Sequence, residues 1–276
     1  MDEYADLIKK ELGEYIPPGS GVDKPMQPSC FLSKTQGPST VEELAAMEEI
    51  PYRKTTGMLM YYQIAMRLDI SFPVGKCARY MANPGMPHWR ALQRILKWIE
   101  THPNAYLEFR QPKDDALRNV LVWFVDSDWA SDPDDMKSTL GHIGYINGAP
   151  FLWVSRKQKS QASSSGEAEV KAAHGCSLDA MYFRQFMEEI GFFQPPNRMY
   201  EDNNAALAYI SDPLVRGRMK HIHKDYHVIK EFVESGYTHP IKIDTSLNVA
   251  DGLTEAQATA DFEYFLSQTL HFGSAR

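Results

Sequence analysis

The sequence predicts an α/β protein in which a mixed five-stranded sheet is flanked by helices and preceded by a small helical subdomain. Three observations support this prediction. The spacing of apolar residues changes near residue 113, from the spacing typical of helices to the alternation typical of strands. An Asn147-Gly148 pair joins two alternating segments, which is the strongest short signal for a β-hairpin. Two later strand segments are separated by helical segments, an order typical of a mixed sheet covered by helices.

The first part of the chain is predicted to contain a linker and a small helical unit. Residues 1–52 begin with the amphipathic segment MDEYADLIKKELGEY and continue with stretches rich in Pro, Gly and Ser, which predicts a short helix and a linker. Residues 53–112 have apolar residues at helical spacing and form the predicted helical subdomain. The segment HWRALQRILKWIETH places four aliphatic residues on one face: Leu92, Ile95, Leu96 and Ile99.

Residues 113–276 are predicted to form the domain that contains the sheet. The first strand is NVLVWFV, the next two flank Asn147-Gly148, and the last two cover residues 197–202 and 239–246. The predicted helices cover residues 163–192, 204–211, 221–236 and 249–270. Three strands joined by turns and two joined through helices therefore build one mixed sheet.

The composition is that of an ordinary globular chain, with 43% hydrophobic residues, 24% charged residues and a net charge of −7. No apolar run reaches the roughly 18 residues of a membrane helix, and the charged first residues do not resemble a signal peptide. Cys30, Cys77 and Cys176 form no CxxC pair, which argues against a disulfide framework or a zinc site. We therefore expect an intracellular protein that is not secreted and has no membrane partner.

Carboxylates occur where a sheet of this kind collects functional side chains. The segment VWFVDSDWASDPDD carries Asp126 directly after the first strand, and YEDNN carries Asp202 at the end of the fourth. Sites in sheets with helical crossovers form beyond such strand ends. Asp251, in NVADGL, lies where the last helix is expected to begin, a place that also suits a plain N-cap. Carboxylates that converge from several elements would supply the oxygen ligands that a pair of hard cations requires.

The long helix offers two further acids, and helical spacing distinguishes them. Glu169 shares its face with the residues of the stripe expected to pack on the sheet: Ala173, Cys176, Ala180 and Phe183. Glu167 shares a wetter face with Lys171, His174 and Leu178. A glutamate on a buried stripe is costly unless it is paired, so we expect a cation to account for Glu169.

Several longer segments are distinctive. In chain order they are VDSDWASDPDDMKSTLGHIGYINGAPFLWVSRKQKSQASSSGEAEVKAA, YEDNNAALAYI, RMKHIHKDYHVIKE and NVADGLT. They resemble the ribonuclease H domain of copia-type LTR retrotransposon polyproteins. Upstream, PYRKTTGMLMYYQIAMRLDISFPVGKCARYMANPGMPHWRALQRILKWI resembles the segment that connects reverse transcriptase to ribonuclease H in those polyproteins. YADLIKKELGEY and KPMQPS resemble the end of the polymerase, so the resemblance covers nearly the whole chain.

The resemblance implies a ribonuclease H-like fold and an endonuclease that hydrolyses the RNA strand of RNA–DNA hybrids. Two Mg²⁺ ions, for which Mn²⁺ can substitute, would be held by four carboxylates: Asp126, Glu169, Asp202 and Asp251. One ion would lower the pKa of the attacking water, and the other would stabilise the leaving 3′ oxygen. The implied partners are the hybrid and the upstream polymerase part, in the cytoplasm, a virus-like particle or the nucleus. No small-molecule cofactor is implied.

Substrate contacts are expected from residues close to these carboxylates. The resemblance places Asn204 where the family often contacts the minor groove and makes Ser165 a second candidate. The segments SRKQKS and VRGRMKHIHKDYHVIK supply basic side chains for phosphates: Arg156, Lys157, Lys159, Lys220 and His221. Recognition of the hybrid would depend on shape and 2′-OH contacts more than on base sequence.

The chain departs from the family pattern at three places. Arg67-Leu68-Asp69 stands in place of RPD, Leu253-Thr254-Glu255-Ala256 in place of LTKP, and Gly166 in place of a threonine. None of these departures removes an expected metal ligand.

Two other interpretations stand beside this one. The acids that follow Asp126 are expected in a solvated turn, without the Gly and the terminal Glu of an EF-hand calcium loop: Asp128, Asp132, Asp134 and Asp135. The alternative function is a catalytically silent nucleic-acid-binding or assembly module derived from such an element.

Overall fold

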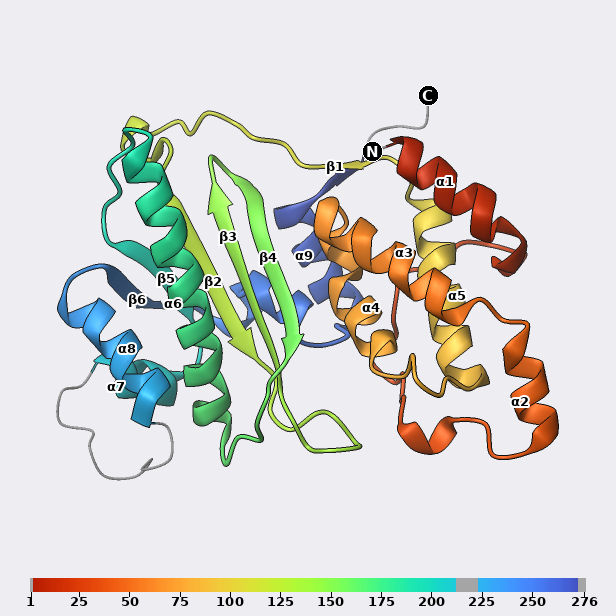
Figure 1. Cartoon of the computed structure of the whole chain (residues 1–276). Coiled ribbons are helices and arrows are strands. Elements are labelled where there is room, and N and C mark those ends of the chain that lie inside the picture. Colours follow the sequence, from red (N-terminus) through yellow and green to blue (C-terminus); the bar gives the residue numbers. More distant parts are fainter. Residues whose placement is uncertain (1, 212–222, 273–276) are drawn as a thin grey trace. The chain divides into compact units, whose positions relative to one another are not determined.

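The chain folds into two units, and the computed structural model describes residues 2–211 and 223–272 (Figure 1). The first unit contains Met1–Leu107 and Glu255–Arg276, and the second contains Glu108–Thr254. Among the described residues, no helix is long and apolar enough to cross a membrane.

The second unit contains the predicted sheet, with the strand order β4-β3-β2-β5-β6. The strands are β2 (Leu121–Ser127), β3 (Thr139–Ile146), β4 (Ala149–Lys157), β5 (Asn197–Glu201) and β6 (Thr238–Lys242). β2, β3 and β4 pair antiparallel, whereas β2, β5 and β6 pair parallel. The mixed five-stranded sheet predicted from the sequence is therefore confirmed.

A tight turn joins β3 to β4 at the predicted position. Asn147 has φ of 49° and Gly148 has φ of 78°, so both residues occupy the left-handed region. A two-residue turn of this kind matches the twist of the flanking strands, and asparagine and glycine adopt it at the least cost. The hairpin predicted from Asn147-Gly148 is confirmed.

One face of the sheet packs on the long helix α6 (Ser165–Glu189), which Figure 1 shows lying along the strands. Alternate residues of β2 enter this interface, and Trp123 and Val125 are fully buried there together with Ala173 and Cys176 of α6. α7 (Asn204–Ser211) and α8 (His223–Glu234) complete the helical layer. Burial of the alternating β2 residues fixes the register of the sheet, because a shift by one residue would expose all of them.

The first unit contains the predicted helical subdomain. Its helices are α1 (Asp2–Leu12), α2 (Val41–Glu48), α3 (Tyr52–Ala65), α4 (Ser71–Ala78), α5 (Met86–Thr101) and α9 (Thr259–Thr269). α2 begins with a capping box. The Thr40 hydroxyl accepts the backbone N–H of Glu43, and the Glu43 carboxylate accepts the backbone N–H of Thr40. α5 buries the predicted face with Leu92, Ile95, Leu96 and Ile99.

The last residues of the chain differ from the predicted division, which assigned 113–276 to one domain. They belong to the first unit, where β7 (His271–Phe272) pairs antiparallel with β1 (Ala105–Tyr106). Phe262 of α9 packs edge-on against Trp98, with ring centroids 5.5 Å apart. These contacts join residues far apart in sequence, so the local spacing of apolar residues does not reveal them.

A buried ion pair lies inside the first unit, at the Arg67-Leu68-Asp69 segment. Arg67 and Asp69 are both inaccessible to solvent and form two parallel hydrogen bonds, of 2.9 and 2.7 Å. The Asp69 carboxylate also accepts the indole N–H of Trp98 at 2.7 Å, and Arg67 donates to the carbonyl of His102. The segment that resembles the family's RPD therefore braces the helical unit through a fully satisfied polar network.

When one partner of this pair is replaced, the first unit should unfold at a lower denaturant concentration. Asp69→Asn leaves Arg67 charged and buried without its counter-ion, so we expect a loss of about 3–5 kcal/mol in the free energy of unfolding. The matched control is Asp23→Asn, which removes the exposed ion pair with Arg94 and should cost about 1 kcal/mol or less. Urea unfolding followed by tryptophan fluorescence measures both, and equal costs would contradict a structural role for Asp69.

Candidate metal centre

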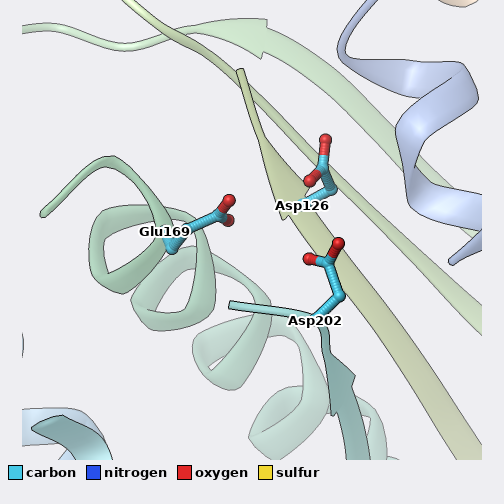
Figure 2. Close-up of side chains that lie close together, drawn as sticks. All are labelled: Asp126, Glu169 and Asp202. Carbon is cyan, nitrogen blue, oxygen red and sulfur yellow. The ribbon is translucent and has the colours of Figure 1, made fainter. Parts of the chain in front are cut away.

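Three carboxylates from three elements converge at one end of the sheet in the second unit. Asp126 lies on β2, Glu169 lies on the second turn of α6, and Asp202 follows β5 directly. Each offers a carboxylate oxygen, and these oxygens all lie within 4.8 Å of one another. Figure 2 shows the three side chains directed toward a common point.

The parallel pairing of β2 and β5 explains why Asp126 and Asp202 meet. Phe124 pairs with Tyr200 across these strands, and their rings stack with centroids 4.9 Å apart. Asp126 and Asp202 each follow this pair by two residues, on strands that run in the same direction about 4.8 Å apart. The two carboxylates therefore leave neighbouring strands at the same level.

Glu169 reaches the cluster from the face of α6 that packs on the sheet. Ala173, Cys176 and Ala180, at helical spacing from Glu169, are all buried, as the sequence predicts. Glu169 itself is 5% exposed, and its Oε2 has no hydrogen-bond partner among the described residues. A buried carboxylate oxygen of this kind is costly, and a hard cation would satisfy it.

Glu167 is less exposed than its position on the wetter face predicts, at 7%. Its carboxylate is occupied, because it accepts the N–H of Ser163 at 2.9 Å and pairs with Lys171 at 2.8 Å. These bonds tie the first turn of α6 to the residues before it and account for Glu167 without a metal ion.

Burial and neighbouring negative charge act together on Glu169. Burial is the larger cause of a strongly raised pKa of the Glu169 carboxyl, followed by the charges of Glu201, Asp126, Asp202 and Asp251. The same two causes raise the pKa of Glu201, against the N–H of Asn203 and the charge of Lys242, which lower it. Without added positive charge the folded protein therefore favours the protonated forms of Glu169 and Glu201.

Glu201 is the acid that sequence reasoning missed. It is fully buried at the end of β5, its Oε1 accepts the N–H of Asn203 at 2.9 Å, and its Oε2 has no partner among the described residues. The alternation along β5 contained a signal, since Asn197, Met199 and Glu201 share the buried face. Of these two neighbouring acids, only Asp202 matches the family's pattern.

Asp251 approaches the cluster from a short 3₁₀ helix, η6 (Val249–Leu253), and not from the start of the last helix, which begins only at Thr259. The expectation that a helix begins at Asp251 is wrong, because the chain passes from one unit to the other directly after Thr254. Asn248 caps η6, so the plain N-cap interpretation of Asp251 is wrong as well. Asp251 is not part of the 4.8 Å set, although its charge contributes to the raised pKa of Glu169.

Two hydrogen bonds and a close approach at a glycine hold η6 against the sheet. Asn248 donates to the carbonyl of Val125 at 3.0 Å, and the Thr254 hydroxyl donates to Oδ2 of Asp126. Gly141, the pairing partner of Asp126 on β3, permits the close approach. A Cβ at Gly141 would lie 2.7 Å from Cγ2 of Thr254, so any larger residue would push η6 away.

The predicted substrate residues have different surroundings. Arg156 is exposed and lies in the same cross-strand row as Leu140 and Ser127, two strand spacings or about 10 Å from β2. Lys159, Ser165 and Asn204 are also exposed. Lys220 and His221 lie outside the residues that the structure describes.

Lys157 is engaged inside the protein. Its ammonium forms ion pairs of 2.7 Å with both Asp132 and Asp135. Asp132 is only 1% exposed, so the expectation of a solvated acidic turn is wrong for this residue. The loop after β2 is braced by an ion pair between buried Asp132 and half-buried Lys157. Local sequence does not reveal this pair, because Lys157 lies on another strand.

Most of the chain is similar in sequence to Pol polyproteins of plant transposons. No established family profile matches the chain. The retrovirus-related Pol polyprotein from transposon TNT 1-94 of Nicotiana tabacum is 33% identical over 242 residues, which are 88% of this chain and 18% of that protein. The Pol polyprotein from transposon RE1 of Arabidopsis thaliana is 33% identical over 248 residues, 90% of this chain and 16% of that protein. The chain thus spans less than a fifth of the length of these relatives.

Two further similarities cover about half of the chain. The secreted RxLR effector protein 161 of Plasmopara viticola is 32% identical over 136 residues, 49% of this chain and 93% of the effector. Among solved structures, LC11-RNase H1, isolated from compost by a metagenomic approach, covers 49% of this chain and 93% of its own at 12% identity, with a TM-score of 0.39.

The raised pKa of Glu169 predicts a stability that falls with increasing pH when no divalent ion is present. A carboxyl whose pKa is higher in the folded than in the unfolded state stabilises the fold below its ordinary value of 4.5, and this contribution is lost as the pH rises above that value. We expect the melting temperature of the ion-free protein to fall between pH 5 and pH 8, as monitored by circular dichroism.

Glu169→Gln cannot ionise, so its melting temperature should fall less steeply over the same range. Glu263→Gln, on the exposed side of α9, is the matched control and should behave like the unmodified chain. If the melting temperatures of all three proteins fall equally steeply with pH, ionisation of Glu169 does not destabilise the fold.

The Thr254 hydroxyl should matter for divalent-ion affinity. Thr254→Val keeps the shape of this fully buried side chain but removes the bond to Asp126, and loss of such a supporting bond typically weakens metal binding about 10–100-fold. Thr254→Ser retains a hydroxyl and should retain most of the affinity. Calorimetric titration with Mn²⁺ measures both variants, and unchanged binding by Thr254→Val would refute the assignment.

Proposed function

Because the chain belongs to the family of retrovirus-related Pol polyproteins of copia-type retrotransposons, we propose that it is the ribonuclease H part of such a polyprotein. It would hydrolyse the RNA strand of RNA–DNA hybrids endonucleolytically. The observation that carries the proposal is the convergence of Asp126, Glu169 and Asp202 within 4.8 Å, at the shared end of two parallel strands.

The donor set fits hard divalent cations. All its ligands are carboxylate oxygens, which suit Mg²⁺ and Mn²⁺, and no cysteine or histidine belongs to the set. Several buried negative charges held close together also favour more than one ion, and two is the number that the family resemblance implies. Two bound Mg²⁺ ions would supply an activated water and neutralise the charge that develops on the leaving 3′ oxygen.

The chain's own residues have separate tasks in this proposal. Asp126, Asp202 and Glu169 would hold the cations, and Asp251 would add a fourth carboxylate from η6. The Thr254 hydroxyl donates to Oδ2 of Asp126 and fixes the orientation of this carboxylate. Glu201 directly precedes Asp202, and its carboxyl would add negative charge beside the ions when ionised.

The hybrid would be bound by side chains around this end of the sheet. Arg156 and Lys159 are exposed and free to approach phosphates, whereas Lys157 braces the loop after β2. Ser165 and Asn204 are exposed in the first turns of α6 and α7, and we assign them minor-groove contacts. Lys220 and His221 remain candidates for phosphate contact.

The polymerase part of the same polyprotein is the proposed protein partner, because the relatives are more than five times longer than the matched segment. We place the activity inside the cell. The three cysteines of the chain are free, and Cys77 and Cys176 are buried, as expected in a reducing compartment.

A second candidate is a module derived from such an element that does not cleave nucleic acid. The observation in its favour is the effector of Plasmopara viticola. The match covers about half of this chain and nearly the whole effector. The carboxylate cluster favours the nuclease, since a silent module has no need to keep several acids buried together.

Hydrolysis of a labelled RNA–DNA hybrid in the presence of Mg²⁺ or Mn²⁺ tests the proposal. The unmodified chain should cut the RNA strand internally, and chelation of the ions should stop the reaction. Asp126→Asn, Glu169→Gln and Asp202→Asn should each lower the rate by at least about 100-fold, because each removes a charged metal ligand.

Asp115→Asn provides the matched control, since Asp115 is an exposed acid of the same unit outside the cluster. Its rate should equal that of the unmodified chain. Hybrid binding without any cleavage would favour the silent module, and cleavage that survives Asp126→Asn would show that the reaction occurs elsewhere.

A further inference from the structure

Trp129 is an exception among the tryptophans of this chain. Trp129 is 55% exposed, whereas Trp153 is half-buried and Trp89, Trp98 and Trp123 are each 3% exposed or less. An isolated exposed aromatic residue is common on protein surfaces and needs no explanation by itself. The surroundings of Trp129 are what distinguish it.

The indole of Trp129 is held by its polar edge. Its Nε1 donates to the carbonyl of Ala162 at 3.2 Å, and Ala162 is itself buried. The hydrogen-bonding requirement of the ring is therefore satisfied within the protein, while more than half of the side chain remains open to solvent. A ring fixed in this way loses little conformational freedom when a ligand packs on it.

The loop that carries Trp129 is braced on both sides of the ring. The Asp128 carboxylate accepts the backbone N–H of Thr139, and the N–H of Ala130 donates to the Ser138 hydroxyl at 3.1 Å. Ala130 has φ of 55°, a conformation that a residue with a Cβ adopts at a cost. The ion pair of buried Asp132 with half-buried Lys157 anchors the far side of the loop. These contacts maintain one strained loop conformation that presents the indole.

Trp129 lies between the two elements that supply the first two carboxylates. Three peptide links separate it from Asp126, so their Cα atoms are within about 11 Å. Ala162, to which it is bonded, lies just before α6 and seven residues before Glu169. Arg156, at the same end of the sheet, is exposed and basic.

We propose that Trp129 is a substrate-binding residue, whose open ring face packs on a nucleotide of the RNA strand next to the bond cleaved at the carboxylate cluster. The inference rests on the proposed function and adds to it a contact that is neither ionic nor specific for sequence. Every base and every ribose offers a flat or apolar face, so one indole can serve any sequence. Phosphates would lie on Arg156 while the neighbouring nucleotide covers Trp129.

The test measures hybrid binding apart from cleavage, in an Asp126→Asn background. Tryptophan fluorescence of this protein should be quenched by a blunt RNA–DNA hybrid, and the quenching should be absent after Trp129→Phe. Trp129→Ala should weaken hybrid affinity about tenfold, whereas Trp129→Phe keeps a ring face and should recover most of it. Phe193→Ala is the matched control, because Phe193 is an exposed aromatic residue beyond the other end of α6, a helix about 37 Å long.

A second comparison identifies the face that is recognised. If the indole stacks on a base, Trp129→Ala should weaken binding of a hybrid with a single-stranded RNA extension more than binding of a blunt hybrid. If it packs on a ribose, both hybrids should lose affinity equally. With native Asp126 restored, Trp129→Ala should raise KM and leave kcat within about twofold, which a disordered loop would not do.

The outcomes separate this inference from the proposed function. If the chain binds and cleaves the hybrid and Trp129→Ala binds as tightly as Phe193→Ala, the inference is wrong and the nuclease assignment stands. If the unmodified chain neither binds nor cleaves the hybrid, both are wrong.

Discussion

The structure depends on a concentration of negative charge that the protein alone cannot stabilise. Asp126, Glu169 and Asp202 bring carboxylate oxygens within 4.8 Å of one another, and the charge of the buried Glu201 also acts on Glu169. Like charges at this separation repel strongly in a partly desolvated site, so the acids must either bind protons or share cations. The rigid sheet and α6 prevent the third response, which is to move apart.

The rest of the second unit holds these acids in place. Parallel pairing of β2 with β5 sets Asp126 and Asp202 at one level, and the buried stripe of α6 fixes Glu169 above them. On the other face, the absence of a side chain at Gly141 admits η6, which Asn248 and Thr254 then tie to β2. Together these contacts preorganise a site that binds cations. The same arrangement lowers the stability of the fold when no cation is bound.

The sequence predicted those features that depend on local pattern. The period-two alternation, the Asn147-Gly148 turn and the buried stripe of α6 identified the sheet and selected Glu169 over Glu167. Features that depend on distant partners were missed. Burial of Asp132 follows from an ion pair with Lys157, two strands away, and the placement of α9 follows from contacts with Trp98. The alternation along β5 places Glu201 on the buried face, but only the neighbouring Asp202 matches the family's pattern.

The most direct test of this account is the protonation state of Glu169 with and without a divalent ion. Carbon-13 NMR of glutamate carboxyl groups, assigned through Glu169→Gln, reports it at pH 7. The account predicts a protonated Glu169 carboxyl in ion-free protein and its ionisation on addition of Mg²⁺. A carboxylate that is already ionised without any divalent ion, and whose signal is unchanged when Mg²⁺ is added, would contradict it.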